Sequence, residues 1–181
     1  TTTKTLVCDV GSGSVRVGIL KYSSDNILQP IPLAHATKPI EIFNPKTGYY
    51  EQNSTQIWNK FCECTQKCLE ISQVQKVDSI AFSATCSLVI LEKESSKNDV
   101  IMWMDHRAKE QADRITISEH PVLQQFGGSC SPEFSLSKLV WLKENDEERF
   151  RNSLGFMELS DWMSYRCSNF FGKNLGIFFS F

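Results

Sequence analysis

The sequence lacks the features of a membrane protein and of a nucleic-acid-binding protein. It contains no run of 18 apolar residues, and no apolar signal-peptide core follows Thr1–Lys4. Positive charge is not in excess, because the formal net charge is −2 at pH 7. We therefore expect a cytoplasmic protein that binds neither nucleic acid nor a membrane.

Internal repeats, a low-complexity linker and a paired set of cysteines are also absent. The seven cysteines mostly lie in apolar periodic segments, which favours free buried thiols over a disulfide framework. Cys62, Cys64 and Cys68 have a ligand-like spacing but no second pair of ligands. Because Cys62 and Cys68 fall on the expected buried face of a helix, we interpret the three thiols as core residues and not as metal ligands.

Two common nucleotide-binding loops are absent, since neither Gly-x-x-x-x-Gly-Lys-Ser/Thr nor a helix-opening Gly-x-Gly-x-x-Gly occurs. Instead, β-rich residues 6–10 and 15–20 flank Gly11–Ser14, which predicts a hairpin with a glycine-containing turn. The two glycines tolerate positive φ and let another molecule approach the backbone. Asp9 would place a carboxylate beside the turn for a divalent cation, and Arg16 adds a positive charge. On spacing alone, a plain hairpin and a phosphate-binding turn are both open.

The rest of the chain alternates between strand and helix patterns. Residues 26–36 predict a third strand, so three antiparallel strands come first. Asn53 is placed to cap a helix with an apolar stripe. Residues 77–91 are strand-like and are interrupted by small polar residues, which suits an approaching ligand. Further elements are expected as a strand at 100–103, helices from Asp105, Ser135 and Asp146, a charged surface turn at 92–99, a strand at 156–159 and a helix capped by Ser160 or Asp161. This order predicts an α/β layered domain.

Asp105 has two interpretations from the residues alone. It is a candidate N-cap for the helix that follows strand 100–103, in which case His106 and Arg107 face solvent in the first turn. The alternative is a polar binding site at the end of that strand.

Five runs stand out along the chain: Asp9–Arg16, Tyr50–Asn53 with Trp58, Ala84–Val89, Trp103–Ala108 and Lys138–Asn145. In this order they resemble the N-terminal domain of the FGGY family of carbohydrate kinases, and most closely its ribulokinase-like branch. The resemblance implies an actin-like ATPase (ribonuclease H-like) α/β domain over residues 1–169, incomplete at its C-terminal end. Its mixed sheet would have three antiparallel strands followed by alternating helices and strands.

The resemblance also implies ATP-dependent phosphorylation of a hydroxyl on a small-molecule sugar or polyol, in a cleft between two domains, with ATP and Mg²⁺ as cofactors. A pentulose such as D-ribulose is the expected sugar. The ATP phosphates would lie against Asp9, Gly11, Ser12, Gly13, Ser14 and Arg16, and Asp9 would hold magnesium, usually through water. The sugar would contact Thr85, Cys86, Trp103, Asp105, His106 and Arg107.

Three departures from the family pattern stand out. Ser83 replaces the Asp that ribulokinase-like members usually carry, the loop at 91–100 is shorter, and the match stops near Asn169, leaving residues 170–181 as an unmatched aromatic tail. Family members continue into a second domain with the adenine site and the Asp that acts as general base, so no catalytic residue is expected in this chain.

We therefore expect a truncated product or an incomplete gene model of a two-domain kinase. The alternatives are a non-catalytic fragment that binds sugar or a partner protein, and another actin-like superfamily member. A homodimer of the full-length protein is compatible with the resemblance.

Overall fold

The computed structural model describes residues 2–23, 26–92 and 98–171. The chain divides into two units, and it passes from one to the other several times. Unit 1 consists of residues 1–41, 55–85 and 163–181, and unit 2 of residues 42–54 and 86–162. Within the described ranges, no helix has both the length and the apolar character needed to cross a membrane. The expected aromatic tail lies outside the described residues from 172 onward.

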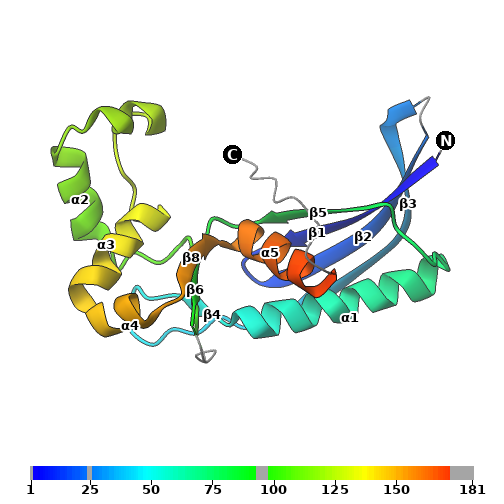
Figure 1. Cartoon of the computed structure of the whole chain (residues 1–181), viewed down its shortest axis with the longest axis horizontal. Helices are drawn as coiled ribbons and strands as arrows, with labels where there is room; N and C mark the ends of the chain where they lie inside the picture. The colour runs from blue at the N-terminus through cyan, green and yellow to red at the C-terminus, as the bar shows by residue number, and fades with distance from the viewer. Residues whose placement is uncertain (1, 24–25, 93–97, 172–181) are drawn as a thin grey trace. The chain divides into compact units, whose positions relative to one another are not determined.

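Unit 1 is built on a four-stranded sheet with the order β3-β2-β1-β5 (Figure 1). Strands β1 (Thr2–Val10), β2 (Ser14–Ser23) and β3 (Asn26–Pro39) are antiparallel to their neighbours, whereas β5 (Ser79–Ala84) runs parallel to β1. The three antiparallel strands expected from the sequence are confirmed, and β5 makes the sheet mixed.

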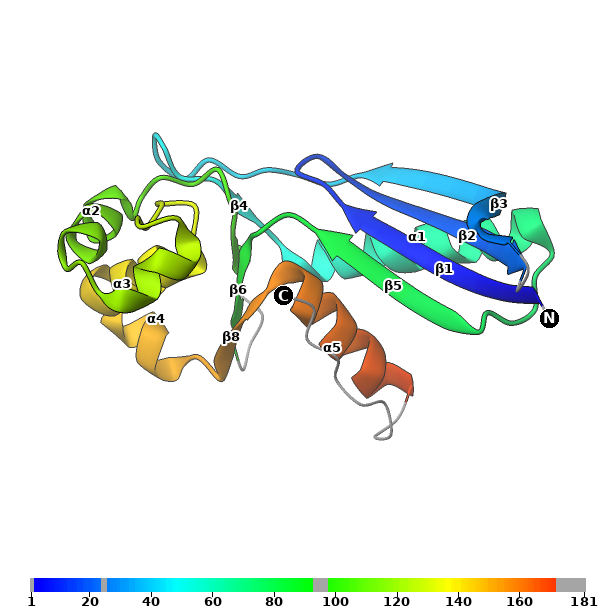
Figure 2. The ribbon, with the colours of Figure 1, turned by 90° about the horizontal axis from the view of Figure 1, so that it is seen from above.

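Helix α1 (Ser54–Ser72) runs along one face of this sheet (Figure 2). Cys64 and Cys68 are buried against it, and the Cys68 thiol donates to the Val17 carbonyl at 3.3 Å. Cys62, which the sequence places on the buried stripe, is exposed instead. The prediction for Cys62 was wrong, because residue 64 and not residue 62 lies on the same sheet-facing side of the helix as Phe61.

From Met163 onward, α5 (Leu159–Phe171) belongs to unit 1 and packs beside α1, where Arg166 lies over the Trp58 ring at 5.2 Å. Its start differs from the expected cap at Ser160 or Asp161, because the helix already begins at Leu159. The Leu159 amide donates to the Ser87 carbonyl at 2.9 Å, within unit 2, which supplies a partner for one of its first amides.

Unit 2 contains a second, antiparallel sheet with the order β4-β7-β6-β8. Its strands are β4 (Glu51–Gln52), β6 (Leu88–Leu91), β7 (Val100–Ile101) and β8 (Gly155–Glu158). The sequence treats residues 77–91 as one interrupted strand. The structure divides them into β5 and β6, which belong to different sheets, because the polar residues between them leave the first sheet.

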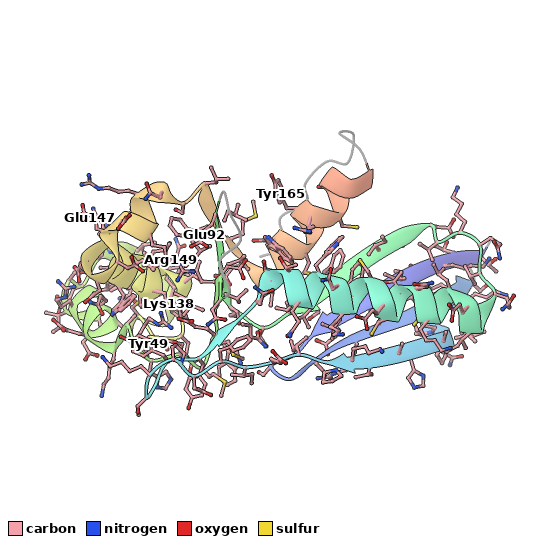
Figure 3. All side chains as sticks on the ribbon, turned by 90° about the horizontal axis from the view of Figure 1, so that it is seen from below. Tyr49, Glu92, Lys138, Glu147, Arg149 and Tyr165 are labelled. Carbon is pink, nitrogen blue, oxygen red and sulfur yellow. The ribbon has the colours of Figure 1, made fainter. Side chains whose placement is uncertain are left out.

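Unit 2 also contains the helices α2 (Lys109–Ile117), the 3₁₀ helix η1 (Pro121–Phe126), α3 (Ser135–Asn145) and α4 (Glu147–Asn152). Helix α3 packs against the second sheet, and α2 and α4 pack against α3. The core of the unit joins Leu88, Ile90 and Ile101 of the sheet to Leu142 of α3. Asp146 caps α4 by accepting from the Arg149 amide, and Arg149 reaches Glu92 at 2.6 Å (Figure 3).

Three local expectations in unit 2 were wrong. Asp105 does not cap α2, because that helix starts at Lys109 with Ala108 in the N-cap position. The apolar pattern of the helix that starts at Ser135 places Leu136 on its apolar side with Leu139 and Leu142, but Leu136 is exposed on α3 and Lys138 is buried. Asp99, expected in a charged surface turn, is buried and accepts a hydrogen bond from the Ser54 amide at 2.7 Å, so it caps the start of α1.

Candidate functional site

The glycine-containing turn between β1 and β2 is closed by backbone hydrogen bonds. The Gly11 amide donates to the Ser14 carbonyl at 3.0 Å, and the Gly13 carbonyl accepts from the Ile40 amide at 3.1 Å. The turn is therefore held both within the hairpin and against the end of β3.

The reason for glycine in this turn differs from the expected one. Neither Gly11 nor Gly13 has φ in the left-handed region. A Cβ on Gly11 would lie 2.7 Å from Nη2 of Arg16, whereas a Cβ on Gly13 would meet nothing within 4 Å. Glycine at 11 thus allows the close approach of a guanidinium, and the backbone at 13 is open to an approaching molecule.

Asp9 and Arg16 lie opposite each other in the β1–β2 register and form an ion pair. Arg16 Nη1 is 3.0 Å from Asp9 Oδ2, and the side chains are 56% and 50% exposed. Arg16 Nε also donates to the Ser14 hydroxyl at 3.3 Å. An exposed pair of this kind contributes little to stability, on the order of 0–1 kcal/mol, so either partner can be released to a ligand at small cost.

The surroundings of Asp9 are compatible with magnesium. No group of three or more His, Cys, Asp or Glu side chains in the described ranges could hold a metal ion. Magnesium does not need such a group, because it keeps several waters and is commonly bound through one or two carboxylates together with substrate phosphates. The half-exposed carboxylate of Asp9 fits that mode of binding.

Two further residues of unit 1 lie beside the end of β1. Ser83 is the register partner of Asp9 on β5, and the Thr85 amide donates to the Val10 carbonyl at 3.1 Å. An aspartate at position 83 would place a second carboxylate next to Asp9. With serine at position 83, Asp9 is the only carboxylate of the Asp9–Ser83 pair.

The remaining candidate sugar contacts lie in unit 2 and differ in exposure. Cys86 and His106 are exposed, and Trp103 is half-buried. The Trp103 amide donates to the Ser87 hydroxyl at 3.2 Å, and the His106 amide donates to the Gly48 carbonyl at 3.2 Å. Their backbones are therefore anchored to neighbouring segments.

Asp105 and Arg107 are buried in a network of charged hydrogen bonds. Asp105 Oδ1 accepts from the Arg107 amide and Nε, both at 2.9 Å, and Oδ2 accepts from Arg107 Nη2 at 2.8 Å and from the Tyr50 amide at 2.7 Å. Arg107 Nη2 also donates to Glu51 Oε1 at 2.7 Å. The interpretation of Arg107 as a solvent-facing residue was wrong, because its side chain is only 3% exposed.

Two aromatic rings cover the Arg107 guanidinium. Its Cζ lies 4.1 Å from the centre of the Tyr49 ring and 5.1 Å from that of Trp141, and the two rings meet edge to face. Burial acts to lower the pKa of Arg107, but Asp105 and Glu51 outweigh it and the net shift is upward. Sequence reasoning gave no role to Tyr49, Glu51 or Trp141, although the last two lie in family-matching runs.

Lys138 of α3 is a second buried cation in this unit (Figure 3). Its Nζ donates to the Glu133 carbonyl at 2.8 Å. Burial lowers the pKa of Lys138 to about 8, against the attraction of Asp105 and Glu158.

The fold recurs in solved sugar kinases. The xylulose kinase from Rhodospirillum rubrum aligns with a TM-score of 0.76, covering 91% of this chain and 33% of that chain at 15% identity. The domain therefore has the actin-like ATPase fold of sugar kinases, as expected from the sequence.

Sequence comparison gives the family. The FGGY family of carbohydrate kinases, N-terminal domain, matches residues 5–176. The FGGY carbohydrate kinase domain-containing protein of Homo sapiens is 36% identical over 178 residues, which is 92% of this chain and 31% of that protein. A D-ribulokinase of Saccharomyces cerevisiae is 32% identical over 174 residues, covering 88% and 24%. The chain belongs to the FGGY family of carbohydrate kinases and spans less than a third of the length of these two relatives.

Proposed function

We propose that this chain is the N-terminal part of a two-domain kinase that transfers phosphate from ATP to a hydroxyl of a pentulose such as D-ribulose. The observation that carries the proposal is the half-exposed Asp9 carboxylate beside a small-residue turn, in a domain of the FGGY family. The similarity to a D-ribulokinase supports the choice of sugar.

In this proposal the turn serves the ATP phosphates. Gly11, Ser12, Gly13 and Ser14 face the phosphate groups, and Asp9 holds Mg²⁺, directly or through water. Bound magnesium neutralises phosphate charge, which together with in-line positioning provides much of the catalysis in phosphoryl transfer. Arg16 pairs with Asp9 in the free chain, and it gives up this ion pair to bind a phosphate oxygen when ATP is present.

Sugar binding is assigned to the segments after β5 and β7. Thr85, Cys86 and His106 offer polar groups to sugar hydroxyls, and Trp103 offers an apolar wall. The general base that accepts the hydroxyl proton belongs to the second domain of the kinase, beyond the 1–169 domain. We place the kinase in the cytoplasm, with no nucleic-acid or membrane partner.

A second candidate function is a non-catalytic fragment that binds sugar or a partner protein. It needs only the exposed Cys86 and His106 and the half-buried Trp103, without the phosphate site at Asp9. The two candidates differ in turnover and not in sugar binding, so both measurements are needed.

The test combines the 181-residue chain with the longest native product of its gene. We expect D-ribulose, but not glycerol, to raise the melting temperature of the chain by mass action. In the long product, D-ribulose should stimulate ADP release, and Asp9→Asn should reduce the rate about 100-fold or more. Asp113→Asn, an exposed carboxylate on α2, is the matched control and should leave the rate unchanged.

The outcomes separate the candidates. ADP release that no pentulose stimulates would overturn the kinase assignment, and together with a sugar-dependent shift of the chain it would establish the binding fragment. A wild-type rate for Asp9→Asn would overturn the phosphate site.

A further inference from the structure

Asp105 has no hydrogen-bonding capacity left for a sugar. An ionised carboxylate offers about four acceptor positions. Asp105 already accepts four hydrogen bonds, one from the Tyr50 amide and three from Arg107, and its side chain is 0% exposed. A hydroxyl could bind it only by displacing one of these donors.

Arg107 is also bound to the protein, and its side chain is only 3% exposed. Its Nε and Nη2 donate to Asp105 and Glu51, and the guanidinium lies close to the Tyr49 and Trp141 rings. The group is therefore fixed at one edge by carboxylates and packed against aromatic rings, an arrangement that suits arginine and not lysine. We call Tyr49, Glu51, Asp105, Arg107 and Trp141 the Arg107 clamp.

The clamp joins two segments that are far apart in the sequence. Glu51 belongs to β4 and pairs with Ile101 at the end of β7. Beyond that pair, the Met102 amide donates to the Tyr50 carbonyl at 3.0 Å, and the His106 amide donates to the Gly48 carbonyl. The segment that carries Trp103 and His106 is thus held at its start by a strand pair and at its end by the Asp105–Arg107 ion pair.

We propose that Glu51, Asp105 and Arg107 are positioning residues, which hold the 102–107 segment so that Trp103 and His106 meet the sugar, and that Asp105 and Arg107 do not contact it. The proposal rests on the proposed function for the identity of the ligand. It revises the sequence-based assignment of Asp105 and Arg107 as sugar contacts and adds Glu51, which that assignment omitted.

The charge balance explains why all three residues are needed. Two carboxylates flank one guanidinium with little exposed area, and removing one partner of a buried pair leaves the other charge uncompensated. Loss of one clamp residue displaces the 102–107 segment slightly. Small displacements of a binding residue have large kinetic effects.

The kinetic test uses the long gene product. Glu51→Gln and Arg107→Met should each raise the KM for the sugar by about 10- to 100-fold and leave the KM for ATP unchanged. Because Glu51 acts through Arg107, Glu51→Gln should add nothing in an Arg107→Met background. Glu144→Gln, which breaks the exposed Arg114–Glu144 pair (51% and 39% exposed), is the control and should change neither KM. Additive effects of the two changes, or an unchanged sugar KM, would overturn the proposal.

A second readout needs no sugar and no turnover. In the 181-residue chain, Arg107→Met should accelerate hydrogen exchange at the Tyr50 and His106 amides about tenfold or more, since both amides depend on the clamped segment. Arg114→Met should leave them unchanged. Unchanged exchange in Arg107→Met would overturn the clamp itself, whereas accelerated exchange in a gene product that phosphorylates no sugar would overturn the proposed function and keep the clamp.

Discussion

At the scale of single residues, the structure buries charged side chains that the sequence pattern would leave exposed. Lys138, Asp99 and Asp105 are all buried, and each has a defined partner: the Glu133 carbonyl, the Ser54 amide and Arg107. Partnered charges of this kind still cost free energy to bury. Burial raises the pKa of Asp99 and lowers the pKa of Lys138 to about 8.

The Lys138 prediction concerns pH. Its pKa falls from 10.5 to about 8 on folding, so between these values the unfolded chain binds more protons than the folded one. The free energy of unfolding should therefore rise with pH across this window, by up to about 3 kcal/mol relative to Lys138→Met, which cannot titrate. Denaturant unfolding of both proteins below, within and above the window measures the difference. Parallel pH profiles would contradict it.

Among the secondary-structure elements, α1 shows which features of a helix its sequence pattern predicts and which it does not. The sequence places its start and its apolar character correctly, and the apolar character follows from the 3.6-residue period, although the carboxylate that caps the start belongs to the distant Asp99. It does not place the boundary of the buried face, since Cys62 and Cys64 differ in exposure. Which thiol is covered depends on the sheet beneath the helix.

Thiol reactivity should report that boundary. Cys62 and Cys86 are exposed, whereas the buried thiols are Cys8, Cys64, Cys68, Cys130 and Cys167. Burial raises the pKa of Cys8 to about 12, which further slows its reaction.

We expect a water-soluble disulfide reagent to modify two thiols quickly in the native chain and the rest only with unfolding. The Cys62→Ser/Cys86→Ser variant should lose the whole fast phase. Fast reaction of Cys64 or Cys68 would show that the packing of α1 on its sheet is wrong.

At the scale of the whole molecule, the chain forms two compact units, each with its own buried apolar residues. Ile19 of β2 is fully buried in unit 1, and Leu142 of α3 is fully buried in unit 2. Each unit is built from segments that are distant in the sequence, so neither unit is complete until the chain has passed through the other.

Cavity-creating variants should act locally. Leu142→Ala should reduce the stability of unit 2 by about 2–5 kcal/mol, and Ile19→Ala should do the same for unit 1. Native-state hydrogen exchange, followed on β6 and on β1, should show the larger loss of protection in the unit that carries the cavity. Equal losses in both strands would mean that the two units unfold as one.

The sequence by itself determined the elements and motifs that depend on neighbouring residues. The antiparallel β1–β2–β3 start, the turn at Gly11–Ser14, α1, α3 and the acidic start of α4 all follow from short-range periodicity and turn chemistry. The ordered family motifs followed as well, because they are contiguous runs.

Only the tertiary structure decided how distant segments meet. It separated β5 from β6 into different sheets, and it buried Asp99, Asp105 and Arg107. Their partners lie 45 to 56 residues away along the chain: Ser54 for Asp99, Tyr50 for Asp105 and Glu51 for Arg107. A charged residue in a loop pattern suggests exposure, and only the arrival of a distant partner makes its burial favourable.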